Sequence, residues 1–178
     1  MMVQRGDRNM DITLVQRNIA AVADGWSSEL AARLGRRALD QSDFATLRDS
    51  GLTLTGVPED MGGVWHSAER STRPLGAIFR TLARVDPSVA LVATMHPTVL
   101  ALWLEQPVEP PNDPDTWREQ RDRVLTAAKA GHWFGTISSE PGGGGDLMAT
   151  RATAALGRDG VWRVTGDKQM GSGSGVTS

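Results

Sequence analysis

Cysteine is absent from the 178-residue sequence. Its absence excludes a disulfide framework, a thiolate metal site and a cysteine nucleophile. The three histidines, His66, His96 and His132, are scattered, and no two of them have the four-residue spacing of helical zinc ligands. The sequence therefore predicts no metal site. The first residues carry charges and lack the apolar stretch of a signal peptide, so we expect a cytoplasmic protein.

An excess of positive charge is also lacking. The formal net charge is -2 at pH 7, and no basic stripe runs along the sequence. Binding to phosphate backbones depends on such charge, so we expect no nucleic-acid partner. The most apolar stretch, residues 88–104, is slightly short for a membrane span and is interrupted by His96 and Pro97. We expect it to form a buried core helix rather than a membrane span.

Helical periodicity dominates the first 130 residues, and the length allows one or two domains. Apolar residues recur there at intervals of three and four, which predicts helices with one buried face. A break is expected near Gly25, and Pro74 is expected in the first turn of its helix. The predicted helices cover approximately residues 12–22, 30–38, 41–49, 75–85, 88–104 and 117–128.

Two of these helices have recognisable starts. Asp86 precedes Pro87, and Asp113 precedes Pro114; an aspartate followed by proline is typical of a helix N-cap and its first turn. Gly51 is expected to end the third helix in a left-handed conformation. Residues 51–63 contain four glycines and a proline, so they are expected to form a structured loop rather than a regular helix.

The pattern changes after Gly131. Residues 133–138 are rich in β-forming side chains and predict a strand. Residues 151–157 and 161–166 flank Asp159-Gly160, a sequence typical of a β-hairpin turn. We therefore predict an α+β protein, with an all-α helical domain at residues 1–130 and an incomplete antiparallel β domain at residues 131–178. The chain is expected to stop soon after a third strand, which leaves sheet edges exposed.

Glycine-rich runs occupy residues 142–145 and 171–175. Neither run has the spacing of a Rossmann, Walker or nucleophile-elbow motif. The first run is framed by Glu140-Pro141 and Asp146, which restrict its conformations, so its backbone N–H groups could be aimed at an anion or a flavin. Taken alone, such runs are more often flexible loops. We expect Glu140 and Asp146 to hold loop amides rather than to act as acid–base groups.

Four segments in this order resemble the acyl-CoA dehydrogenase family. They read GVPEDMGG, LARVDPSVALVATMHPTV, EQRDRVLTAAKAGHWFGTISSEPGGGGD and TGDKQMGSGSG. The resemblance implies a helical N-terminal domain that leads into a β domain, with FAD bound between the β domain and a C-terminal four-helix domain. It also implies that the catalytic base lies in that C-terminal domain, which is missing from this sequence, so no catalytic residue is assigned.

The resemblance further implies which residues bind the flavin. The segment from Thr136 to Gly145 would contact the ring and begin the acyl-thioester site, which places Gly145 beside cofactor and substrate. Ser139 stands where the family commonly has a threonine near the pyrimidine edge, although Ser138 and Ser139 could equally just end a strand. The remaining implied flavin contacts come from a later segment and are Met170, Gly171 and Ser172.

Two departures from the family pattern concern these residues. Gly145 stands where many members have serine, and Met170 replaces a tryptophan that covers the flavin face. A thioether can pack against a ring, but it stacks less specifically. Ser172 falls at the position of a threonine that approaches flavin N5. Serine between small residues also resembles flavin monooxygenases of the same fold, and His96 could then be the histidine that reaches the flavin; otherwise it is a core histidine bonded to a carbonyl.

Three functions follow as hypotheses. The resemblance implies α,β-dehydrogenation of an acyl-CoA or similar thioester by an FAD enzyme that is a homo-oligomer at full length and passes electrons to an electron-transfer flavoprotein. The first alternative is a flavin monooxygenase using FMN. The second alternative is a non-catalytic fragment or interaction module.

Overall fold

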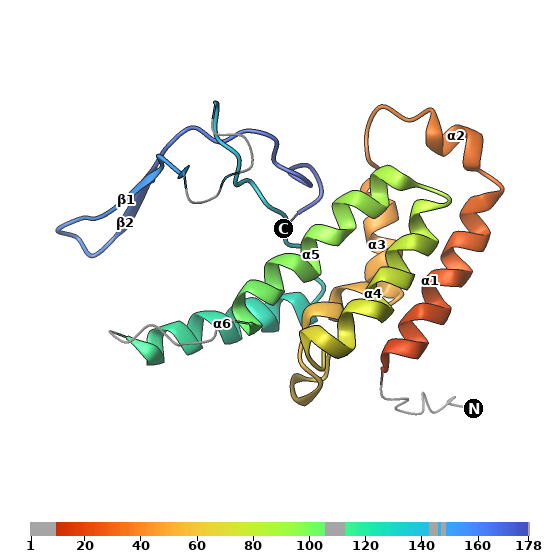
Figure 1. The fold of residues 1–178 in the computed structure, drawn as a ribbon, viewed down its shortest axis with the longest axis horizontal. Helices are drawn as coiled ribbons and strands as arrows, with labels where there is room; N and C mark the ends of the chain where they lie inside the picture. The colour runs from red at the N-terminus through yellow and green to blue at the C-terminus, as the bar shows by residue number, and fades with distance from the viewer. Residues whose placement is uncertain (1–9, 106–112, 143–145, 147–148, 178) are drawn as a thin grey trace, which may run out of the picture.

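A computed structural model describes residues 10–105, 113–142, 146 and 149–177. These residues form an α+β structure that is mostly helical, as predicted (Figure 1). Two short 3₁₀ helices, η1 (Leu52–Gly56) and η2 (Glu59–Met61), occupy the glycine-rich loop. The helices are α1 (Ile12–Ser27), α2 (Leu30–Leu34), α3 (Gln41–Asp49), α4 (Ala68–Ala83), α5 (Pro87–Leu104) and α6 (Pro114–Lys129), and the strands are β1 (Thr153–Leu156) and β2 (Trp162–Thr165).

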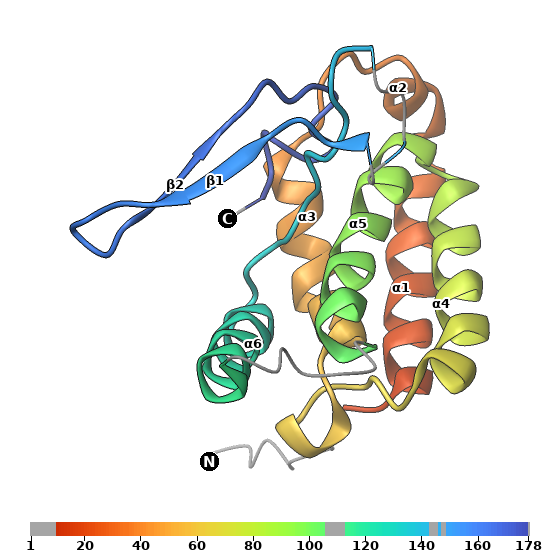
Figure 2. The same ribbon diagram turned by 60° about the vertical axis from the view of Figure 1, so that its left-hand side comes forward.

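The main hydrophobic core lies among α1, α3, α4 and α5. Helix α4 packs against both α1 and α5, and the three helices lie side by side in Figure 2. Helix α3 contacts α5 and α1 as well. Because each helix contributes an apolar stripe, their buried side chains form one continuous cluster. Completely buried members of this cluster include Val15, Ile19, Leu47, Leu52 and Leu82.

Helix α5 begins as the sequence predicts. Asp86 is its N-cap and accepts a hydrogen bond from the Val89 amide at 3.0 Å, and Pro87 is in the first turn. One face is buried in the helical core, whereas Leu91 and Leu102 on other faces are 62% and 61% exposed. The prediction of a core helix is thus correct for one face. By length and composition alone, α5 is also the one helix in the described part of the chain that could span a membrane.

Helix α6 closes a second, smaller core. Its N-cap is Asp113, which accepts a hydrogen bond from the Thr116 amide at 3.1 Å. Leu125 and Ala128 of α6 pack with Val57 and Leu100. The helix ends at Lys129, next to the boundary predicted at residue 130. The division into two domains stays a prediction.

Three helix boundaries differ from the predictions. Helix α4 starts at Ala68 because Ser67 caps it by accepting from the Arg70 amide, so Pro74 lies inside the helix and not in its first turn. Helix α1 continues through Gly25 to Ser27, since Trp26 is buried. The expected helix at 30–38 is shortened to α2, whose ends, Leu30 and Leu34, are exposed rather than part of a buried stripe.

The predicted hairpin is present. Strands β1 and β2 pair antiparallel, with Leu156 opposite Trp162 and Ala154 opposite Val164. Gly160 adopts the left-handed φ of 73° that this turn requires. Figures 1 and 2 show the hairpin projecting from the helices, with its turn at the far end.

The strand predicted at residues 133–138 is not formed. Only an isolated antiparallel bridge between Thr136 and Ser172 is present in this segment. The opposite segment cannot continue the ladder because Met170 has a left-handed φ of 56°. The described residues therefore contain a two-stranded sheet rather than the three strands expected.

Candidate functional site

Two segments that lie far apart in the sequence meet at the base of the hairpin. Thr136 pairs with Ser172, and the Gln169 amide donates to the Ser139 carbonyl oxygen at 2.9 Å. The side chain of Gln169 also donates to the Glu140 carbonyl oxygen, at 3.4 Å. The fold thus brings together residues 136–140 and 169–172, which contain nearly all of the residues expected to bind a flavin.

Several polar groups on these segments are available to a ligand. Within the described residues, the hydroxyls of Ser138, Ser139 and Ser172 have no hydrogen-bond partner. Ser138 is exposed, and the other two serines are half-buried. Thr136 differs because its hydroxyl donates to the Met95 sulfur of α5 at 3.4 Å. The segments therefore present free donors and acceptors without a fixed charge.

Met170 is the most exposed large apolar side chain of the site, at 81%. Its left-handed backbone is uncommon for a residue with a side chain, and such backbone often marks a functional position. The adjacent Gly171 is half-buried. Gly145 lies outside the described residues.

Gly135 permits the close approach of the two segments. A Cβ atom at this position would lie 2.6 Å from the Ser172 carbonyl oxygen and 2.6 Å from a Thr177 methyl group. Any other residue would therefore need the backbone near Ser172 to move.

A buried carboxylate anchors the same region. Glu140 is only 6% exposed. Its Oε1 accepts from the Lys168 ammonium at 2.7 Å, from the Thr150 hydroxyl at 2.5 Å and from the Ala152 amide at 3.0 Å. Its Oε2 accepts from the Arg151 amide at 2.7 Å. Glu140 therefore joins the end of one segment to the residues that enter β1 and to Lys168.

These bonds favour the charged form of Glu140. The hydrogen bond from Lys168, followed by those from Thr150 and Arg151, holds the pKa of Glu140 well below its usual range. A group so strongly held as a carboxylate is a poor proton donor or acceptor near neutral pH. This geometry matches the prediction that Glu140 holds loop amides. A cavity of about 230 Å³ adjoins it, lined by Glu140, Pro141, Arg151, Ala152, Gly166 and Asp167.

His96 is sealed inside the helical core, with none of its surface exposed. The Phe134 amide donates to Nδ1 at 3.1 Å, so Nε2 carries the proton and donates to the Thr53 carbonyl oxygen at 2.9 Å. Burial lowers the pKa of His96 to about 4, because the charged ring would lose its hydration. Its geometry is that of a core histidine bonded to a carbonyl, and both of its nitrogens are occupied.

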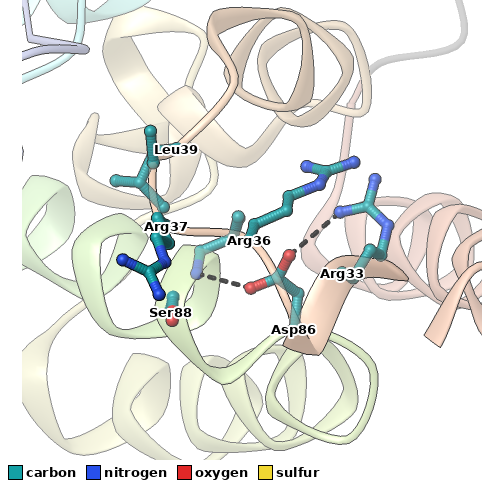
Figure 3. A pocket seen from close by; sticks show the side chains of 8 residues that line it. Arg33, Arg36, Arg37, Leu39, Asp86 and Ser88 are labelled. Carbon is teal, nitrogen blue, oxygen red and sulfur yellow. Dashed lines mark hydrogen bonds and ion pairs between the residues drawn. The ribbon is translucent and has the colours of Figure 1, made fainter. Parts of the chain in front are cut away.

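A separate cavity of about 140 Å³ lies beside the first turn of α5 (Figure 3). Three arginines that precede α3 in the chain, Arg33, Arg36 and Arg37, line it. Arg33 is buried, stacks on the Trp26 ring at 3.7 Å, and donates to Asp43 at 2.7 Å and to Asp86 at 3.0 Å. Arg36 also pairs with Asp43, at 2.6 Å. The carboxylates are thus already neutralised, and this network joins α2, α3 and α5 rather than forming a reactive site.

In the described residues, no three histidine, aspartate or glutamate side chains are grouped so that they could hold a metal ion. No protein-family model matches the chain, and neither curated proteins nor solved structures give a significant match.

Sequence reasoning missed Lys168, Thr150 and Gln169 as parts of this site. Lys168 and Glu140 are 28 residues apart, and a single sequence carries no information on which distant charges pair. The framing of the glycine run by Glu140 was the one local indication that this carboxylate binds backbone amides.

Proposed function

We propose that this chain binds FAD between residues 136–140 and 169–172 and belongs to a flavin-dependent oxidoreductase that resembles acyl-CoA dehydrogenases. The observation that carries the proposal is the pairing of Thr136 with Ser172, which joins the two segments that the resemblance assigns to the flavin. The fold implied is the N-terminal helical domain and the beginning of the β domain of that family.

The residues present fit a flavin. Three unpartnered hydroxyls can hydrogen-bond to its nitrogens and oxygens, and the exposed Met170 thioether can pack on the ring face. The close approach at Gly135 keeps the two segments, and therefore these groups, next to one another. When bound, the flavin supplies the capacity to accept a hydride, and this chain's residues bind and orient it.

The substrate proposed is an acyl-CoA or similar thioester, and an electron-transfer flavoprotein is proposed as the acceptor, with a homo-oligomer as the assembly. In the family, a carboxylate of the C-terminal domain removes the substrate's α-proton. Glu140 does not suit that role because hydrogen bonds from Lys168 and two backbone amides occupy both of its oxygens and lower its affinity for a proton. No residue of this chain is therefore given the role of catalytic base.

Flavin affinity tests the proposal. Purified protein is titrated with FAD and, separately, with FMN, and quenching of flavin fluorescence gives the dissociation constants. Ser139→Ala and Ser172→Ala should each weaken FAD binding about 2- to 10-fold, the effect of one neutral hydrogen bond. Ser88→Ala, an exposed serine at the start of α5, should leave binding unchanged.

Failure to bind either flavin, in a protein whose circular dichroism shows it to be folded, would contradict the proposal and favour a non-catalytic module. Clearly tighter binding of FMN than of FAD would favour the monooxygenase alternative. Equal affinities of Ser139→Ala, Ser172→Ala and wild type would remove these residues from the site.

A further inference from the structure

Glu140 lies at one end of the paired segments. It directly follows Ser139, whose carbonyl accepts from the Gln169 amide, and its partner Lys168 directly precedes Gln169. The Lys168 ammonium also donates to the Ser138 carbonyl oxygen at 3.3 Å. The Glu140–Lys168 pair therefore bridges the two segments next to their backbone hydrogen bond.

The same carboxylate holds the start of the hairpin. Its bonds to Thr150, Arg151 and Ala152 come from the residues before β1. The residues of β1 and β2 are exposed on both faces, so apolar burial does little to hold the hairpin in position. Hydrogen bonds to a charged, largely buried acceptor are stronger than neutral ones, which makes Glu140 the main polar anchor at the hairpin base.

We infer that Glu140 is a positioning residue for the flavin: its carboxylate sets the spacing of residues 136–139 and 169–172 and thereby the affinity for the ring, without touching the ring itself. The inference rests on the proposed function for its effect on flavin. Its effect on the spacing of the two segments is independent of any ligand.

The hairpin offers a matched control at its far end. Asp159 also forms an ion pair with an arginine, Arg163, at 2.6 Å, but both side chains are more than half exposed and lie at the turn. Asp159→Asn removes the same kind of charge from the same hairpin. An exposed pair of this kind contributes little to stability, so this variant should leave the paired segments unchanged.

The experiment compares wild type, Glu140→Gln and Asp159→Asn. Amide hydrogen exchange is measured first without flavin, and FAD affinity and the visible spectrum of bound FAD are measured next. In Glu140→Gln, exchange of the Gln169 amide should become about 10-fold faster or more, and FAD affinity should fall about 10-fold or more, with a shifted flavin spectrum. Asp159→Asn should match wild type in all three measurements.

Unchanged exchange at Gln169 in Glu140→Gln would overturn the inference, as would faster exchange confined to residues 151–165 with wild-type FAD affinity. If Glu140→Gln does not fold, Lys168→Met removes the bridge from its other side and should give the same changes. If wild type binds no FAD, the proposed function fails, and the exchange of the Gln169 amide still decides whether Glu140 sets the spacing.

Discussion

In the helical part of the molecule, Ile19, Leu47 and Leu82 are completely buried, whereas every residue of β1 and β2 is exposed. The helices are held together by an apolar core, in which burial of each side chain contributes about 1.5–3 kcal/mol. The hairpin instead depends on its own ladder and on hydrogen bonds at its base. Stability and ligand binding are therefore expected to reside in different regions, and mutations should separate them.

The largest effect is expected at the buried ion network of the helical part. Arg33→Ala leaves the buried Asp86 without its ion-pair partner and leaves the buried Asp43 with Arg36 alone; both carboxylates are 4% exposed. Breaking a buried pair in this way should lower the free energy of unfolding by about 3–5 kcal/mol. Unfolding with a chemical denaturant measures this change in the free energy of unfolding. Arg123→Ala, which removes a pair with two exposed partners, is the control and should cost less than about 1 kcal/mol; equal losses would show that burial does not matter here.

Leu82→Ala should have the next largest effect. Its side chain is completely buried between helices, so truncation should lower the free energy of unfolding by about 2–5 kcal/mol through lost burial and a cavity. The matched variant Leu34→Ala removes a side chain that is 60% exposed and should change stability by less than about 0.5 kcal/mol. A small loss for Leu82→Ala would mean that the helical core is loosely packed.

His96 should make the stability of the helical part depend on pH. Its pKa is lowered from 6.5 to about 4 in the fold, so protons bind the unfolded state more tightly. Its contribution is therefore complete above about pH 6.5 and is lost as the pH falls through 4, by up to about 3 kcal/mol. Denaturant unfolding curves recorded across this pH range give the slope of the free energy of unfolding against pH. His96→Gln keeps one donor and one acceptor on the side chain but removes the titrating group, so it should flatten the slope, whereas exposed His132→Gln should not. Identical slopes in wild type and both variants would show that His96 is not the source of the pH dependence.

The smallest effect is expected in the hairpin. Trp162 is 64% exposed, so Trp162→Ala should change the free energy of unfolding by less than about 0.5 kcal/mol. Trp133→Ala, at a tryptophan that is 6% exposed and packs edge-on against Phe44, should cost about 3–5 kcal/mol. Thermal unfolding of both variants gives the comparison. A large loss for Trp162→Ala would show that the hairpin is covered in solution.

Local features of the fold could be predicted from the sequence. The N-caps Asp86 and Asp113, the left-handed Gly51 and the hairpin turn at Gly160 all follow from a few neighbouring residues, because their hydrogen bonds close within one turn. The α+β character follows from the same local periodicities. The position of Pro74 differs from the prediction because the helix has a stronger start at Ser67, seven residues earlier, whose side chain caps it.

Long-range pairings could not be predicted in this way. Arg33 and Asp86 are 53 residues apart, and Glu140 and Lys168 are 28 apart. Which charges meet depends on how helices and loops pack, and one sequence holds no record of that. The strand predicted at residues 133–138 does not form for the same reason. Its composition favours a strand, but the segment that pairs with it at Ser172 has a left-handed backbone at Met170, so the hydrogen-bond ladder cannot continue.

The absence of a single carbon atom at Gly135 has a consequence for how this region can vary. The Ser172 carbonyl occupies the space that even an alanine methyl would need. Adding that methyl would push the backbone at residue 135 away from the backbone at Ser172. Every hydroxyl, charged group and thioether of the region would still be present in the chain. The residue types of this region therefore do not by themselves fix its geometry. The distance between the two backbone segments depends on the absence of a side chain at Gly135.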